Sequence, residues 1–153
     1  GLMIKDGEPF LVEFNVRMGD PECQTILPKL KTDLMDILIS CCDGTLNQLK
    51  ISFSKSKSIC VVLCSKGYPE EFENNIEIKN LQQLKLLKNQ NIFHAGTLKT
   101  ETGTVSNGGR VLNFVSISDD FLKSRDEAIN LIKKLNWKNG YYRNDIGHKV
   151  IKI

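Results

Sequence analysis

An unbroken run of apolar and β-branched residues at positions 58–65, Ser-Ile-Cys-Val-Val-Leu-Cys-Ser, constrains the fold more than any other segment. Val and Ile favour a pleated strand, and the run is too short for a typical helix. Because no polar residue alternates with the apolar ones, the pattern predicts a strand that is buried on both faces. Gly67, Tyr68 and Pro69 follow and end this strand.

A helical pattern at residues 121–135 supplies one cover for the predicted sheet. Its apolar side chains recur on one helix face: Leu122, Ala128, Ile129, Ile132 and Leu135. Asp120 stands at the preferred N-cap position, and Lys133 and Lys134 lie where cations interact favourably with the helix dipole. We expect Trp137 to pack this helix onto the sheet.

The remaining pattern is that of an α+β protein. Further strands are predicted at residues 2–4, 10–16, 49–53, 92–100, 105–106, 110–116 and 148–153. A helix is predicted at residues 25–42 as a connector. The first two strands flank Asp6-Gly7, a typical hairpin turn. Because the edge of this hairpin is exposed, we predict self-association or disorder near residues 1–10.

Charge and cysteine usage exclude several classes of protein. The formal net charge is only +3 and the lysines are scattered, so no nucleic-acid partner is expected. The five cysteines form no CxxC pair and no disulfide framework, which is typical of reduced thiols in the cytoplasm. No apolar run is long enough to cross a membrane, so no membrane partner is expected.

The segment at residues 13–22, Glu-Phe-Asn-Val-Arg-Met-Gly-Asp-Pro-Glu, carries the side chains best suited to chemistry. On a strand, Glu13, Asn15 and Arg17 lie on one face, while the apolar residues between them point into a core. A carboxylate and an amide oxygen suit Mg²⁺, which also takes phosphate oxygens and water. The guanidinium can hold a phosphate. Spacing alone also fits a solvent-facing strand with a Glu13–Arg17 pair, which is the more common arrangement.

The chain closely resembles the glycinamide ribonucleotide synthetase family, also called phosphoribosylamine–glycine ligase. Residues 12–24, Val-Glu-Phe-Asn-Val-Arg-Met-Gly-Asp-Pro-Glu-Cys-Gln, resemble the end of the ATP-grasp domain of that family. Five further segments resemble the family in the same order: residues 30–34 (Leu-Lys-Thr-Asp-Leu), 67–69 (Gly-Tyr-Pro), 93–97 (Phe-His-Ala-Gly-Thr), 108–112 (Gly-Gly-Arg-Val-Leu) and 142–147 (Tyr-Arg-Asn-Asp-Ile-Gly). Ordered matches along nearly the whole chain are more specific than any single motif.

This resemblance implies an ATP-dependent carbon–nitrogen ligase of purine biosynthesis. It would join glycine to 5-phosphoribosylamine through an acyl phosphate, with ATP cleaved to ADP and phosphate. By resemblance, Glu13 and Asn15 match the Mg²⁺ or Mn²⁺ ligands. Arg17 would lie beside the phosphates as the catalytic residue.

Four more residues are substrate-binding candidates on the same resemblance: Asp20, Glu22, Gly109 and Arg110. Asp20 and Glu22 could orient Arg17 or the glycine amine, or could simply cap the following helix. Gly109 and Arg110 could bring backbone amides and a guanidinium to a phosphate. The alternative is a tight turn whose arginine pairs with a carboxylate.

The same resemblance implies a division of the chain into three parts. Residues 1–24 would be the last strands of an ATP-grasp domain, residues 25–45 a connecting helix, and residues 46–153 a C-terminal domain with a small antiparallel or mixed sheet packed by one long helix. The family enzyme is longer, so we expect this chain to be inactive alone. The alternatives are another ATP-grasp carboxylate–amine ligase and a non-catalytic binding module. A lone His94 is typical of a hydrogen-bonded packing residue, and Arg143 with Asp145 of a structural ion pair.

Overall fold

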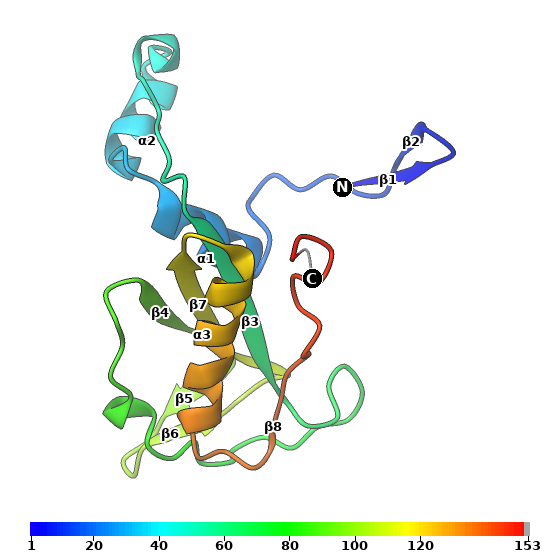
Figure 1. Cartoon of the computed structure of the whole chain (residues 1–153), viewed down its shortest axis with the longest axis vertical. Coiled ribbons are helices and arrows are strands. Elements are labelled where there is room, and N and C mark those ends of the chain that lie inside the picture. Colours follow the sequence, from blue (N-terminus) through cyan, green and yellow to red (C-terminus); the bar gives the residue numbers. More distant parts are fainter. Residues whose placement is uncertain (152–153) are drawn as a thin grey trace.

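A four-stranded antiparallel sheet forms the centre of the computed structural model, which describes residues 1–151 (Figure 1). Its strands stand in the order β4-β7-β3-β8. Their bounds are Lys57–Ser65 for β3, Gln90–His94 for β4, Arg110–Ser118 for β7 and Gly140–Tyr141 for β8. The predicted buried strand at residues 58–65 is therefore confirmed as an interior strand, with only Val62 half-buried.

Helix α3, Phe121–Lys134, covers one face of this sheet (Figure 1). The Asp120 carboxylate caps it by accepting a hydrogen bond from the backbone N–H of Lys123 at 2.7 Å. The core between helix and sheet is formed by buried apolar side chains, among them Val61, Leu63, Leu112, Phe114, Ala128, Leu131 and Trp137. The predicted helix, its cap and the packing role of Trp137 are confirmed, but Leu122, which was placed on the packed face, is 45% exposed because it lies on the solvent side of the first turn.

Helix α1, Glu22–Ile26, lies against β3 and β7 and continues into a short 3-10 turn at Leu27–Lys29. The single helix predicted at residues 25–42 is wrong. Pro28 cannot donate a backbone hydrogen bond, and the chain turns extended at Leu30, which forms an isolated bridge with Phe53. A second helix, α2, then spans Leu34–Cys42.

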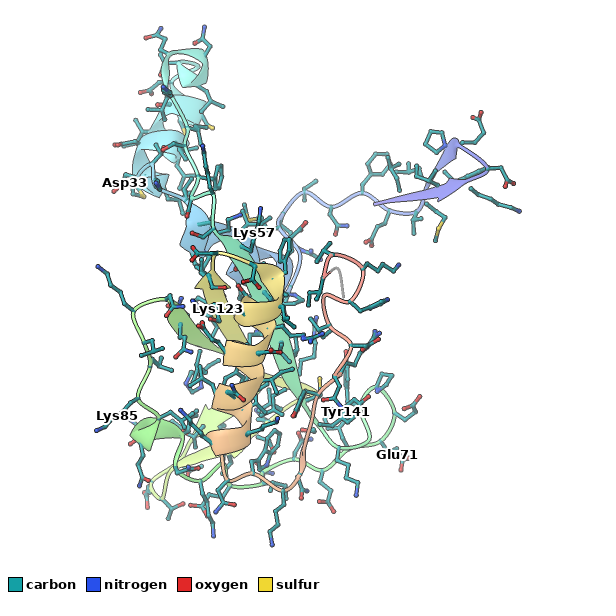
Figure 2. The ribbon with its side chains drawn as sticks, viewed as in Figure 1. Asp33, Lys57, Glu71, Lys85, Lys123 and Tyr141 are labelled. Atoms are coloured by element: carbon teal, nitrogen blue, oxygen red, sulfur yellow. The ribbon has the colours of Figure 1, made fainter. Side chains whose placement is uncertain are left out.

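Helix α2 extends away from the body of the molecule (Figure 1). Asp33 caps it by accepting a hydrogen bond from the backbone N–H of Met35 at 2.7 Å, and Figure 2 places Asp33 in this arm. The predicted strand at 49–53 is wrong: these residues follow a 3-10 turn at Leu46–Gln48 and contribute only the single bridge from Phe53. Several apolar side chains of α2 remain exposed: Leu34, Met35, Leu38 and Ile39.

The strand predicted at 92–100 is divided in two. Strand β4 ends at His94, and a separate hairpin pairs β5, Thr97–Lys99, with β6, Thr104–Ser106. The break falls at Gly96, where a Cβ atom would lie 2.7 Å from the carbonyl oxygen of Arg110. Two backbones approach there more closely than any side chain permits, so the chain leaves the main sheet at this point.

The N-terminal hairpin forms as predicted, but it is shorter. Strand β1, Leu2–Lys5, pairs antiparallel with β2, Glu8–Leu11, and the hairpin projects from the body (Figure 1). The prediction that residues 10–16 form one strand with an inward apolar face is wrong, because Phe14 is 84% and Val16 100% exposed, and Val12 is exposed as well. Within residues 1–151 no third strand lies beside the hairpin, so the ladder ends at Leu11.

The C-terminal tail crosses the sheet domain without forming the predicted strand. Residues 148–151 form a turn, in which Ile151 is buried in the core, and positions 152–153 of the prediction lie outside the described residues. The Arg143–Asp145 pair is confirmed, with Nε–Oδ1 at 2.9 Å and Nη2–Oδ2 at 2.6 Å. Across the described part of the chain, no helix combines the length and apolar character needed to span a bilayer.

Replacing Asp120 with Ala should lower the free energy of unfolding by about 1 kcal/mol, because the N-cap hydrogen bond to Lys123 is lost. Urea denaturation followed by circular dichroism would measure the change. The neighbouring Asp119→Ala removes the same charge without a cap, and it should be nearly neutral. Equal losses in both variants would contradict a capping role.

The exposed hairpin should cause this chain to self-associate, because its edges and apolar side chains are open to a second molecule. Sedimentation velocity should show a mass that rises with protein concentration. Phe10→Lys should suppress the rise by placing charge on the hairpin, whereas Leu122→Lys, an exposed position on α3, should not. A monomer at every concentration would contradict the prediction.

Candidate active site

The proposed metal ligands lie together in the extended segment after β2. The side-chain amide of Asn15 donates a hydrogen bond to the Glu13 carboxylate, with Nδ2–Oε1 at 2.8 Å. Both side chains are exposed, and the amino terminus of Gly1 donates to the backbone oxygen of Glu13 at 2.9 Å. A carboxylate and an amide thus lie side by side on the surface, although the strand predicted there does not extend past Leu11.

Arg17 does not pair with Glu13. Its Nη1 donates to the backbone oxygen of Met18 at 3.2 Å, and the ion pairs within residues 1–151 do not include it. The alternative of a Glu13–Arg17 surface pair is therefore not formed in this structure. The guanidinium remains exposed at the end of the segment.

Glu13 and Asn15 can hold only part of a metal's coordination sphere. Mg²⁺ is octahedral and takes hard oxygen ligands, so a carboxylate and an amide carbonyl fit it chemically but leave several positions to phosphate oxygens, water or other groups. Among the residues that the structure describes, no cluster of three or more His, Cys, Asp and Glu side chains is suited to a metal. The segment could therefore supply only part of a metal site.

The two remaining parts of the candidate site meet at Asp20 and Arg110. Arg110 forms an ion pair with the Asp20 carboxylate, with Nη2–Oδ2 at 3.2 Å, and its Nη1 donates to the Asp20 backbone oxygen at 2.7 Å. The side chains of Arg110 and Asp20 are 41% and 43% exposed, so solvent screens the pair and its net contribution to stability is small. The contact fixes position: it joins the start of β7 to the loop before α1.

Glu22 makes a local contact in that loop. Its Oε2 accepts a hydrogen bond from the backbone N–H of Gly19 at 2.8 Å, while Asp20 Oδ1 accepts one from the Gln24 amide at 2.9 Å. Both carboxylates therefore bond locally around the start of α1, but neither forms a side-chain cap of that helix, so the capping alternative is not formed. The Arg110–carboxylate pairing, the alternative for Arg110, is formed.

A tight turn at Gly108 and Gly109 holds Arg110 in place. Ser65, at the end of β3, donates from its backbone N–H to Gly109 and from its hydroxyl to Gly108, both at 2.8 Å. A Cβ atom on Gly109 would lie 2.1 Å from Cδ2 of Tyr68, so the tyrosine ring rests directly on the glycine. The contact of Tyr68 with Gly109 was not predicted from the sequence. The only signal for it was that Tyr68 and Gly109 both lie in glycine-containing turn motifs, at residues 67–69 and 108–109.

Two buried thiols on β3 lie near this junction. Burial and, to a smaller extent, the negative charge of Asp20 together raise the pKa of Cys60 to about 12. Burial also raises the pKa of Cys64, while the positive charge of Arg110 acts in the opposite direction. Both thiols therefore stay protonated at neutral pH and are not poised as nucleophiles.

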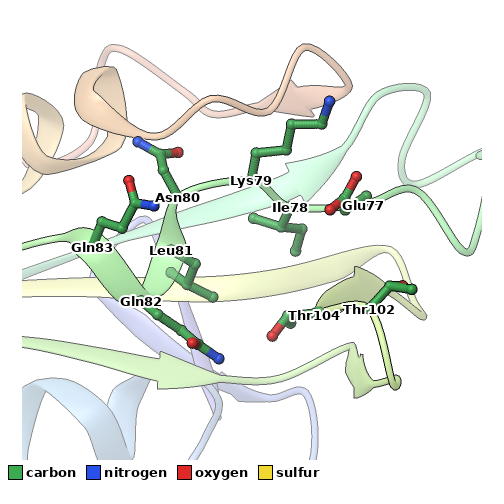
Figure 3. Close-up of a pocket in the computed structure, with 10 residues that line it drawn as sticks. Glu77, Ile78, Lys79, Asn80, Leu81, Gln82, Gln83, Thr102 and Thr104 are labelled. Carbon is green, nitrogen blue, oxygen red and sulfur yellow. The ribbon is translucent and has the colours of Figure 1, made fainter.

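Other polar residues serve the fold. His94 is exposed, and its Nδ1 lies 2.8 Å from the Thr97 hydroxyl, so the predicted hydrogen bond is present but the side chain is not packed in the core. A pocket of about 230 Å³ lies between the 77–83 segment and the start of β6, and Figure 3 shows Asn80 on its wall. The Asn80 amide bonds to the backbone of Lys134 and Asn136 at the end of α3, at 2.8 and 2.7 Å. None of the predicted site residues lines this pocket.

Comparison with known proteins shows the family to which the chain belongs. Residues 58–149 match the model "Phosphoribosylglycinamide synthetase, C domain". The chain is 40% identical over 156 residues to a chloroplastic phosphoribosylamine–glycine ligase of Arabidopsis thaliana, covering 99% of this chain and 29% of that protein. It is 40% identical over 154 residues to the phosphoribosylamine–glycine ligase of Fusobacterium nucleatum, covering 100% of this chain and 36% of that protein.

A solved structure agrees with these relatives. The crystal structure of the phosphoribosylamine–glycine ligase of Thermotoga maritima matches with a TM-score of 0.72 and 30% sequence identity. The match covers 96% of this chain and 36% of that one. The chain thus spans about a third of the length of the curated relatives it matches.

Replacing Gly109 with Ala should destabilise the protein by about 1–3 kcal/mol, because the new methyl group overlaps the Tyr68 ring. Thermal unfolding would measure the loss. Tyr68→Ala in the same chain removes the ring, so adding Gly109→Ala to that variant should cost much less. A Gly109→Ala penalty that is equal with and without Tyr68 would show that the ring is not the cause.

Proposed function

Because the chain belongs to the phosphoribosylglycinamide synthetase family, we propose that it is the C-terminal part of an ATP-dependent ligase that joins glycine to 5-phosphoribosylamine. One observation carries the proposal: the whole chain aligns with phosphoribosylamine–glycine ligases from a plant and a bacterium. These relatives share one name, which favours this ligase over other ATP-grasp ligases. No observation favours a non-catalytic binding module.

The proposed reaction has two steps. The glycine carboxylate attacks the γ-phosphorus of ATP, which releases ADP and leaves a glycyl phosphate. The amine of phosphoribosylamine then attacks the glycyl carbonyl carbon, and phosphate leaves. Neither step needs a covalent enzyme intermediate, so positioning and charge neutralisation are the tasks of the protein. This agrees with the absence of an activated thiol at the Asp20–Arg110 junction.

Glu13 and Asn15 are proposed to hold Mg²⁺ or Mn²⁺ at the ATP phosphates. The exposed carboxylate and amide, joined by the 2.8 Å hydrogen bond, support this role. When bound, the metal would supply positive charge that neutralises the phosphates. Arg17, whose guanidinium has no carboxylate partner within residues 1–151, is proposed to stabilise the transferring phosphoryl group.

Gly109 and Arg110 are proposed to bind an anionic part of the substrate. The turn is rigid, because Tyr68 rests on Gly109, and the arginine is partly exposed. Asp20 is proposed to position Arg110 when no anion is present, since it already holds the guanidinium through two contacts. Glu22 is proposed to order this loop through its bond to Gly19.

The division of the chain follows from the same proposal. Residues 1–24 would end an ATP-grasp domain, 25–45 would connect, and 46–153 would form the C-terminal domain. The exposed apolar side chains of the hairpin and of α2 support this, because they are surfaces that the remaining two-thirds of such an enzyme could cover. A cytoplasmic location is also proposed, supported by five free cysteines.

Glu13→Gln should lower the rate of ligation by roughly 100-fold or more. Loss of a group that only orients a metal ligand lowers activity by roughly 10–100-fold, and loss of the ligand itself should lower it at least as much. The assay would use a chimaeric enzyme in which this chain replaces the matching segment of the Fusobacterium nucleatum ligase. The measured quantity would be the rate of ADP formation that depends on both glycine and phosphoribosylamine. Asn15→Leu should act similarly. Glu8→Gln, the same change on β2, is the control and should be neutral.

The 153-residue chain alone should show no ligase activity, because its described residues complete no metal site and it spans only about a third of the length of its relatives. The assay would use purified chain with ATP, Mg²⁺, glycine and phosphoribosylamine. ATP-dependent product formation by the chain alone would overturn this expectation.

A further inference from the structure

The sequence contains two Asn-Gly pairs, and the structure gives them different surroundings. Asn107-Gly108 lies between β6 and β7, and Asn139-Gly140 lies at the turn into β8. The asparagine amide is a thermally labile group. Because glycine has no Cβ to shield its backbone nitrogen, that nitrogen can approach the side-chain amide carbon of a preceding asparagine. Both pairs therefore offer the same chemistry, and their hydrogen bonds decide which of them can react.

The Asn107-Gly108 pair is open to reaction. Asn107 is exposed, and its side-chain amide forms no hydrogen bond with another residue of 1–151. The backbone N–H of Gly108 likewise has no acceptor within the same residues. Neither reacting group has to break a hydrogen bond before the two can meet.

The Asn139-Gly140 pair is protected at both reacting groups. Asn139 Nδ2 donates a hydrogen bond to Glu73 Oε2 at 2.9 Å, which holds the amide toward another loop. The backbone N–H of Gly140 donates to the carbonyl oxygen of Trp137 at 3.2 Å. Both bonds would have to break before the nitrogen could attack the amide, so this pair is an internal reference for the first.

We propose that Asn107 is a site of spontaneous deamidation, at which the folded chain is modified by reaction with water. The backbone nitrogen of Gly108 attacks Cγ of Asn107, and the new N–Cγ bond closes a cyclic imide. Nδ2 leaves as ammonia and carries away the proton that the Gly108 nitrogen loses. Water then opens one of the two imide C–N bonds, which gives either aspartate or isoaspartate at position 107. This proposal is independent of the proposed ligase function.

The modification would act on the turn that carries Arg110. Isoaspartate adds a methylene group to the backbone before Gly108, where the chain is tightly packed: a Cβ atom on Gly96 would lie 2.9 Å from Gly108 Cα. Either product also places a new carboxylate near Arg110, whose present partner is Asp20. We therefore expect the modified chain to unfold at a lower temperature than the fresh chain.

The test is an incubation of the folded 153-residue chain at two pH values one unit apart, with its peptides followed by mass spectrometry. Asn107 should deamidate roughly 10-fold or more faster than Asn139, since each hydrogen bond that must break corresponds to about 5-fold in rate. The rate at Asn107 should rise by roughly 10-fold at the higher pH, because the deprotonated fraction of the attacking nitrogen rises in that proportion. In guanidinium chloride the two rates should become similar, because the protecting bonds are lost.

Two variants test the two halves of the comparison. Asn107→Gln lengthens the side chain and should abolish the reaction at this position, so that the incubated variant keeps the unfolding temperature of the fresh chain. Glu73→Ala removes the acceptor of the Asn139 amide and should speed deamidation there by about 5-fold. Glu70→Ala, another exposed glutamate of the same loop, is its control and should change neither rate.

Equal rates at the two asparagines of the folded chain would overturn the proposal. An Asn107 that reacts only in guanidinium chloride would overturn it as well, because the folded turn would then protect the amide. A Glu73→Ala chain that reacts at Asn139 no faster than the parent would also contradict it.

Discussion

The antiparallel pairing of β3 with β7 is the interaction on which the other elements depend. Each strand is buried along nearly its whole length, and their cross-strand neighbours, such as Val61 opposite Phe114, fill the core under α3. The same ladder presents its other face to α1. The β3–β7 ladder also fixes the position of Arg110, the first residue of β7. Ser65, the last residue of β3, donates hydrogen bonds to Gly108 and Gly109 directly before this arginine. A shift in this register would move the core and the candidate site together.

Local sequence patterns were enough to predict β3 and α3, because the tertiary packing of both elements buries the side chains that their patterns mark as apolar. A continuous apolar run predicts strand β3, and an apolar helix face with an N-cap at Asp120 predicts helix α3. The strand at 10–16 and the helix at 25–42 were mispredicted for opposite reasons. The first has an apolar alternation but no neighbouring strand to complete a ladder. The second has helical spacing, but Pro28 and the extended residues after it interrupt the hydrogen bonds.

The candidate site was predictable to the extent that its parts are close in sequence. Glu13 and Asn15 are two positions apart, and a 2.8 Å hydrogen bond joins their side chains although the segment is not the predicted strand. The Asp20–Arg110 contact joins residues 90 positions apart, and no local rule foresees it. The buried amide oxygen of Gln24 and the buried amide of Asn113, which have no hydrogen-bond partner within residues 1–151, are also invisible in the sequence, because only the packing of α1 on the sheet shows which polar atoms lack a partner.

The Asp20–Arg110 contact has a further consequence for how the protein moves. Within residues 1–151, the hydrogen bonds and ion pairs that join positions 1–20 to the sheet domain all come from Arg110. The segment with Glu13, Asn15 and Arg17 is therefore bonded to the sheet domain only through Asp20, while Gly19 and Asp20 are also bonded to α1. An anion that took Arg110 away from Asp20 would remove the one polar link between this segment and the sheet domain.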